Sequence, residues 1–103
     1  MVVEHAVISV TPGREEEFEA LFPTARAVIA GADGFLWGEL HRFVERPSVF
    51  LLLVGWTSLE AHQAFRDSER FPQWRGHIGP FFDGPPVVEH VTAVSAGVTS
   101  AAG

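Results

Sequence analysis

The run VFLLLVGW at residues 49–56 constrains the fold of this chain more than any other feature. Side chains of a strand point alternately to its two faces, and here both sets are apolar. A strand of this kind has both faces covered and lies centrally in its sheet. The preceding ERPS, residues 45–48, predicts a hairpin that joins this strand, taken as 48–56, to another over 35–44.

Periodicity in the rest of the chain predicts two more strands and the first helix. Residues 2–10 and 87–94 are rich in β-branched side chains and are predicted to be strands. After Thr11-Pro12-Gly13, apolar residues recur at helical spacing up to Ile29. Pro23 lies inside that pattern and cannot donate a helical hydrogen bond, so we expect a kink or a break there.

A second helical region follows the central strand. TSLE at 57–60 matches a capping box, with Thr57 as the N-cap and Glu60 at the third helical position. The helix is predicted to run to about Arg66. Asp67-Ser68 then begins another helix, which carries a stripe of large apolar side chains.

The order of these elements is β-α-β-β-α(α)-β, the split βαβ arrangement. It predicts an α+β fold, with a four-stranded antiparallel sheet and helices on one face. The other face would be bare, although the strand over 48–56 is apolar on that side too. We therefore expect a homodimer in which a second copy packs sheet to sheet. Residues 1–95 are predicted to form one domain, and 96–103 a loosely held tail.

Four residue types are absent from the chain, namely Lys, Cys, Tyr and Asn. Their absence excludes Schiff-base lysines, thiolate nucleophiles, disulfides and cysteine-ligated metals. A formal net charge of −6, with seven scattered arginines, opposes binding to nucleic acid or to an anionic membrane surface. No apolar run reaches the roughly 18 residues of a membrane span, and no export signal is visible, so we expect a cytoplasmic protein.

Several segments together resemble the antibiotic-biosynthesis-monooxygenase-like proteins of the dimeric α+β-barrel superfamily. They are the first strand with Pro-Gly after it, the ERPS hairpin, VFLLLVGWTSLEAHQAF, RFPQWR and PPVVEHVTAV, and they cover roughly residues 2–95. The resemblance implies a ferredoxin-like fold whose dimer closes two sheets into a barrel. Members include cofactor-independent monooxygenases acting on polyketide anthrones and haem-degrading enzymes, and polyketide cyclases are related to them.

The residues at the family's functional positions match the haem degraders poorly and the quinone-forming monooxygenases only in part, which leaves non-oxidative chemistry on a related substrate open. The resemblance places His5, Phe65 and Arg75 about where haem degraders have Asn, Trp and a ligand His, with His77 two residues from the ligand position. Of the Asn, Trp and Tyr associated with the pockets of quinone-forming members, this chain has only Trp. We therefore expect neither haem, nor a metal, nor any other cofactor.

Histidines are the candidate acid–base residues, since the usual pocket of this fold lies between the helices and the sheet. His62, which has apolar neighbours at helical spacing, and His5 on the first strand are the predicted catalytic residues. Each has an alternative interpretation as a structural or surface histidine. VVEH occurs at both 2–5 and 87–90, and the register decides whether His5 and His90 share a face. The predicted substrate-binding residues are Phe65, Trp74, Arg75, His77, Phe81, His90 and Trp37.

The sequence thus predicts a small-molecule enzyme that resembles the cofactor-independent monooxygenases. It would act on an aromatic or polyketide-like substrate, with a histidine as the general base. One alternative is a non-oxidative cyclase or isomerase, and another is a non-catalytic ligand-binding dimer. A third is a metal or haem protein whose ligands are His5, His62 and His90.

Overall fold

A computed structural model describes residues 1–95 of the chain. The prediction for the tail, 96–103, lies outside the described residues. The elements, in chain order, are β1 (Val2–Ser9), α1 (Glu15–Ile29), β2 (Phe35–Arg42), β3 (Val49–Trp56), α2 (Leu59–Arg66), α3 (Arg70–Ile78), the short 3-10 helix η1 (Gly79–Phe81) and β4 (Val87–Val91). This order confirms the predicted ferredoxin-like α+β fold.

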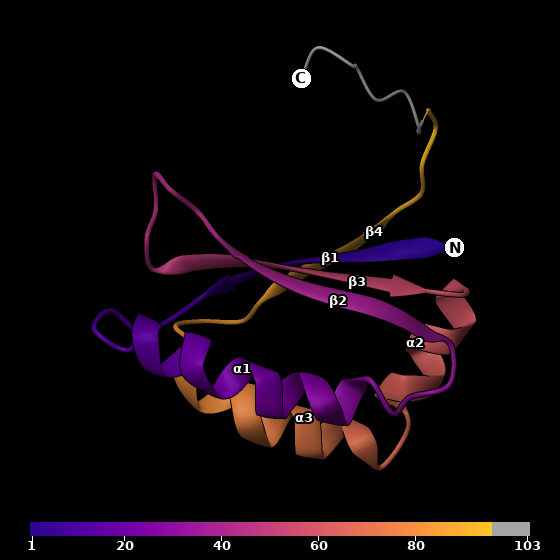
Figure 1. Ribbon diagram of the computed structural model, residues 1–103, viewed down its shortest axis with the longest axis horizontal. Helices are drawn as coiled ribbons and strands as arrows, with labels where there is room; N and C mark the ends of the chain where they lie inside the picture. The colour runs from indigo at the N-terminus through magenta and orange to yellow at the C-terminus, as the bar shows by residue number, and fades with distance from the viewer. Residues whose placement is uncertain (96–103) are drawn as a thin grey trace.

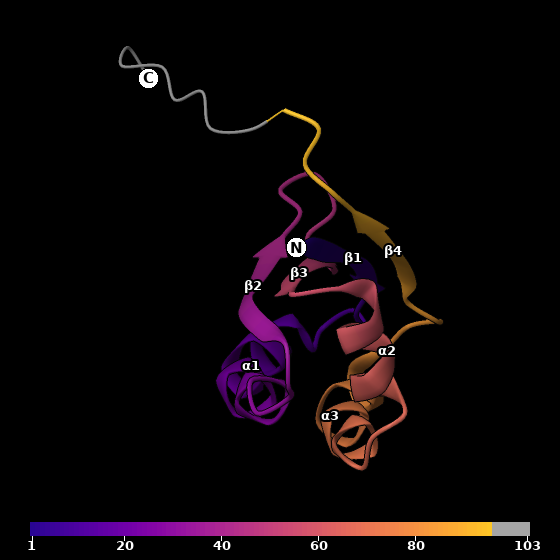
Figure 2. The ribbon, with the colours of Figure 1, turned by 90° about the vertical axis from the view of Figure 1, so that its right-hand side faces the viewer.

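The four strands form one antiparallel sheet in the order β2-β3-β1-β4. The apolar strand β3 lies inside the sheet, as its sequence predicts. The three helices lie on one face of the sheet, where α1 packs beside α3 (Figure 1, Figure 2). None of the described helices is both long and apolar enough to cross a membrane.

The core lies between the sheet and the helix layer. Alternate residues of β3, including Phe50, Val54 and Trp56, are buried under the helices. Phe18 and Ile29 of α1 meet them from the other side and are themselves almost fully buried. The opposite face of β3 is only partly covered, so the helices bury one of the two apolar faces that the sequence presents.

Several predicted boundaries are wrong by one to three residues, and for the start of α2 the reason is local. The backbone N–H of Thr57 still donates to the carbonyl of Gly34 at 2.8 Å, which continues the extended chain. The N-cap is therefore Ser58, whose hydroxyl accepts a hydrogen bond from Ala61 N at 3.1 Å. The last helix begins at Arg70 rather than at 67, because Asp67 still caps the end of α2.

Helix α1 continues through Pro23 without the break that the sequence allowed for. Pro23 lies on the exposed side of the helix. Water can therefore bind the carbonyl of Glu19, which lacks its usual N–H partner. The apolar stripe on the buried side, from Phe18 to Ile29, holds the helix against the sheet on both sides of the proline.

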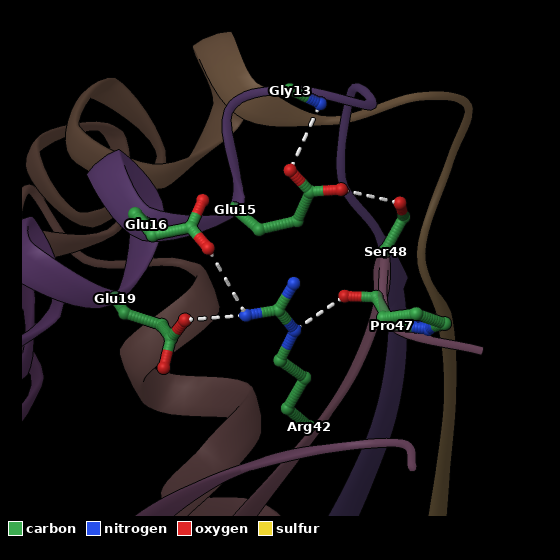
Figure 3. A network of polar contacts seen from close by, with 7 residues as sticks. All are labelled: Gly13, Glu15, Glu16, Glu19, Arg42, Pro47 and Ser48. Carbon is green, nitrogen blue, oxygen red and sulfur yellow. Dashed lines mark hydrogen bonds and ion pairs between the residues drawn. The ribbon is translucent and has the colours of Figure 1, made fainter. Parts of the chain in front are cut away.

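A polar network ties the start of α1 to the β2–β3 hairpin (Figure 3). Glu15 accepts hydrogen bonds from the Ser48 hydroxyl at 2.5 Å and from the backbone N–H of Gly13 at 2.9 Å. The bond from Ser48 is the main reason that the pKa of Glu15 is lowered. Arg42 of β2 contacts Glu16, Glu19 and the carbonyl oxygen of Pro47. These contacts fix one end of the helix layer on the sheet, away from the cavity described below.

Candidate functional site

A cavity of about 440 Å³ lies between the helix-facing side of the sheet and helices α2 and α3. Its volume is within the range of small-molecule sites. Most of its lining residues are apolar, among them Ile8, Leu52, Phe71, Trp74, Ile78 and Phe82. The charged or titratable side chains in the lining are Glu4, His62, Arg66 and Arg75. The cavity can therefore hold a molecule with a large apolar part and bind its polar groups at these side chains.

A buried chain of polar groups forms one part of this cavity. Glu4 and His62 both line it and are 6% and 4% exposed. Nε2 of His62 lies 3.2 Å from Oε1 of Glu4, and Nδ1 of His62 lies 2.6 Å from Nε2 of His90. The indole N–H of Trp56 donates to the same Glu4 oxygen at 3.1 Å. Four residues from β1, β3, α2 and β4 are thereby joined.

The alternation of the strands and the spacing of α2 bring these groups together. Glu4 pairs directly with His90 in the β1–β4 register, so both side chains point to the helix side of the sheet. His62 and Phe65 are three residues apart and form the buried side of α2. The imidazole of His62 stacks on Trp56, with the ring centroids 5.0 Å apart and the planes at 14°.

Burial sets the protonation of both central groups. It raises the pKa of Glu4, while the Trp56 hydrogen bond and the charge of Arg66 act in the opposite direction. Burial, followed by the charges of His90 and Arg66, lowers the pKa of His62 to about 4. His62 is therefore neutral at physiological pH, and its 3.2 Å approach to Glu4 is a close polar contact rather than an ion pair.

The chain has two self-consistent hydrogen-bonding states, because a neutral imidazole has one N–H. With Glu4 ionised, the N–H of His62 is at Nε2, next to Glu4, and Nδ1 accepts from His90. With Glu4 protonated on Oε1, Nε2 of His62 carries no proton, and Nδ1–H donates to His90. The two states differ by one proton, and neither places a charge on His62. The arrangement can take up and release a proton between the cavity and the partly exposed His90.

Glu4 lines the cavity, and the contacts of its carboxylate with Trp56 and His62 involve only Oε1, so Oε2 is its second oxygen. It has no hydrogen-bond partner among the described residues. Since every fully buried side-chain oxygen or nitrogen of the described residues has a partner, this oxygen is accessible. Glu4 is therefore placed to exchange a proton directly with a bound molecule.

The predicted site residues divide into those at the cavity and those away from it. His62, Trp74 and Arg75 line the cavity, and His90 joins it through His62. Phe65 is buried behind the wall, with its ring 5.5 Å from that of Trp56. The remaining predicted residues do not line it, namely His5, Trp37, His77 and Phe81.

The register places His5 and Trp37 on the opposite face of the sheet. His5 pairs with Glu89, whereas Glu4 pairs with His90, so His5 and His90 point to opposite sides. Trp37 lies across Gly55, where no room remains for a Cβ atom. His77 is exposed on α3, and Phe81 is buried against Phe18 in the core.

Sequence reasoning missed Glu4 as a site residue. A charged residue in the apolar run 2–10 was the available signal, because carboxyl groups are seldom buried without partners. Within residues 1–95, no three His, Asp or Glu side chains are arranged to hold a metal ion. The metal-ligand set His5, His62 and His90 is not assembled, since His5 lies on the other face.

Comparisons with known proteins agree with this architecture. The family model described as antibiotic biosynthesis monooxygenase matches residues 1–76. The uncharacterized protein YczJ of Bacillus subtilis (strain 168) is 36% identical over 91 residues, which cover 87% of this chain and 96% of YczJ.

Solved structures of similar chains share the fold. A Bordetella bronchiseptica protein named after the antibiotic biosynthesis monooxygenases is 39% identical, with a TM-score of 0.88 over 91% of this chain and 97% of that one. SnoaB, a cofactor-independent oxygenase from Streptomyces nogalater, is 20% identical, with a TM-score of 0.78 over 92% of this chain and 94% of SnoaB. The likeness to SnoaB is one of fold.

Proposed function

Because the chain belongs to the antibiotic biosynthesis monooxygenase family, we propose that it is a cofactor-independent monooxygenase for a flat aromatic or polyketide-like molecule. The observation that carries this proposal is the buried Glu4–His62–His90 chain, which opens into a cavity with aromatic walls. Such walls orient a ring and exclude water, and the polar chain supplies an acid–base group where the ring would lie.

The proposed reaction begins with proton transfer from an acidic C–H or O–H of the substrate to Oε2 of ionised Glu4. After the protonated carboxyl group turns its O–H toward Nε2 of His62, one proton shifts from Glu4 to His62 Nε2 and another from His62 Nδ1 to His90, toward the protein surface. The resulting enolate or phenolate is electron-rich and reduces O2 by one electron. Recombination forms a C–O bond, and protonation gives a hydroperoxide. Loss of water from the hydroperoxide leaves a carbonyl, so a CH2 group and O2 become C=O and H2O.

In this proposal His62 is a relay rather than the direct acceptor predicted from the sequence. Both of its ring nitrogens are already engaged, by Glu4 and by His90. Its lowered pKa also disfavours the imidazolium that a direct histidine base would form. Burial raises the pKa of Glu4, which makes its carboxylate a stronger proton acceptor than an exposed glutamate.

Oxygen consumption with an anthrone, such as 1,8-dihydroxyanthrone, tests this proposal. Wild-type protein should consume O2 and form the quinone, measured with an oxygen electrode and by absorbance. Glu4→Gln should reduce turnover by about 100-fold or more, the lower end of general acid–base contributions. Glu60→Gln, on the exposed surface of the same helix as His62, is the matched control and should keep full activity. Equal activity of the Glu4 and Glu60 variants would refute the assignment.

A second candidate, a non-oxidative cyclase or isomerase, is favoured by the same acid–base chain, which needs no oxidant. The anaerobic reaction separates the two functions. Substrate conversion that proceeds without O2 would identify proton transfer as the whole reaction. Binding without conversion under either atmosphere would instead identify a ligand-binding protein.

We further propose that the uncovered sheet face binds a second copy of the chain. This face carries the apolar side chains Val3, Val7, Leu51, Leu53 and Trp37, and no helix of the described residues covers it. Light scattering on a sizing column should give the mass of two chains, and Leu53→Asp should lower it to that of one. Leu59→Asp, on exposed α2, is the control that should leave the mass unchanged. A wild-type mass of one chain would contradict this proposal.

A further inference from the structure

Two arginines border the cavity from neighbouring helices. Arg66 is the last residue of α2, and Arg75 lies in α3. Neither forms an ion pair with any carboxylate of the described residues. Arg42 of the same chain, in contrast, contacts two glutamates. In a protein with a net charge of −6, two arginines without carboxylate partners at one cavity form a local positive site.

The position of Arg75 is fixed by the cavity wall itself. Its guanidinium carbon lies 5.1 Å from the ring centroid of Phe82 and 5.9 Å from that of Phe71. Both rings line the cavity. Cation–π contacts of this kind leave the N–H groups of the guanidinium free to donate to an anion.

Arg66 also lines this cavity, and its charge affects the pKa values of Glu4 and His62. It follows His62 by four residues, about one helical turn, on the side of α2 that borders the cavity. Burial, followed by the charges of His90 and Arg66, sets the lowered pKa of His62. Among the described residues that line the cavity, Glu4 has the only carboxyl group, which accepts a hydrogen bond from Trp56 and lies 3.2 Å from His62.

We propose that the ligand of this cavity is an organic anion, an aromatic carboxylate whose ring lies between the apolar walls and whose carboxylate binds Arg75 and Arg66. Guanidinium groups donate paired hydrogen bonds that match a carboxylate. The inference rests on the proposed function for the location of the site. The inference adds that the ligand is negatively charged. A binding experiment can test the preference for a negative charge without any turnover.

Titration calorimetry with 2-naphthoate and its neutral amide, 2-naphthamide, tests the inference. The two probes share ring size and shape and differ in charge. Wild-type protein should bind the carboxylate roughly tenfold more tightly than the amide, the scale of a partly solvated charge-assisted contact. Added salt should weaken binding of the carboxylate and leave that of the amide unchanged.

Arginine variants show whether the proposed residues supply that preference. Arg75→Gln and Arg66→Gln should each reduce carboxylate affinity toward that of the amide. Arg46→Gln is the matched control, because Arg46 also lies over a phenylalanine ring but belongs to the β2–β3 hairpin, outside the cavity. All three arginines are exposed, and circular dichroism checks that each variant remains folded.

Three outcomes would overturn the inference: no binding of naphthoate at millimolar concentration, equal affinity for the two probes, or unchanged carboxylate affinity in both cavity variants. Naphthoate preference without O2 consumption on any substrate would uphold the inference while the monooxygenase proposal failed. Turnover of the anthrone together with equal affinity for the two probes would support the monooxygenase proposal and refute the inference that the ligand is an anion.

Discussion

The protonation of His62 gives a quantitative prediction for stability against pH. Burial, with smaller effects of His90 and Arg66, lowers the pKa of His62 from 6.5 to about 4 in the folded protein. An unfolded chain lacks these effects and binds the proton more readily between these two values. Stability therefore falls as the pH falls through this window, in the direction opposite to that of a histidine whose pKa is raised by folding. Lowering the pH from about 7 to about 5 removes about 2 kcal/mol through this one group.

His62→Gln removes the titrating group and isolates this effect. The variant loses the stack on Trp56, which lowers its stability by an amount that does not depend on pH. It should lack the additional loss of about 2 kcal/mol on acidification. Burial raises the pKa of Glu4, so protonation of Glu4 stabilises the folded state as the pH falls. Glu4 is present in both proteins, and comparing their two pH-dependent changes largely removes its contribution.

Urea unfolding at both pH values, at one fixed protein concentration and followed by tryptophan fluorescence, measures the difference. His41→Gln is the control, because His41 is more than half exposed and lies on the other face of the sheet. This control should keep the wild-type dependence on pH. If His62→Gln loses as much stability as the wild type between the two pH values, His62 is not held neutral by burial, and the proposed relay fails.

Four further substitutions test the fold. Phe18→Ala, at a fully buried position in contact with two other phenylalanine rings, should cost about 3–5 kcal/mol in urea unfolding, and a loss below about 1 kcal/mol would contradict the core assignment. Ser58→Ala should cost about 1 kcal/mol by removing the N-cap of α2, whereas Thr57→Ala should cost clearly less. Gly34→Ala should lower the melting temperature by several degrees, because Gly34 has a φ of +84° and a new Cβ would lie 2.6 Å from that of Ala61. A melting temperature equal to that of the wild type would contradict the backbone geometry at Gly34.

One central residue of the candidate site, His62, could be predicted from the sequence, and the other, Glu4, could not. The presence of His62 on the buried side of a helix was predictable from its apolar neighbours at helical spacing. The role of Glu4 was not, because alternation alone shows that Glu4 and His5 point apart and does not show which of them faces the helices. That choice is made by the packing of α2 and α3 against β1 and by the pairing of Glu4 with His90.

The order of elements, the inside position of β3 and the placement of the helices on one face were predictable from the sequence. These features follow from periodicity and from local turn chemistry, which depend on neighbours in the chain. Strand pairing and helix packing place His90, and not His5, on the helix side of the sheet, where it contacts His62, and they place Arg66 and Arg75 at the cavity. A shift of one residue in strand register exchanges the two faces, and no local pattern in the two identical VVEH segments distinguishes the outcomes.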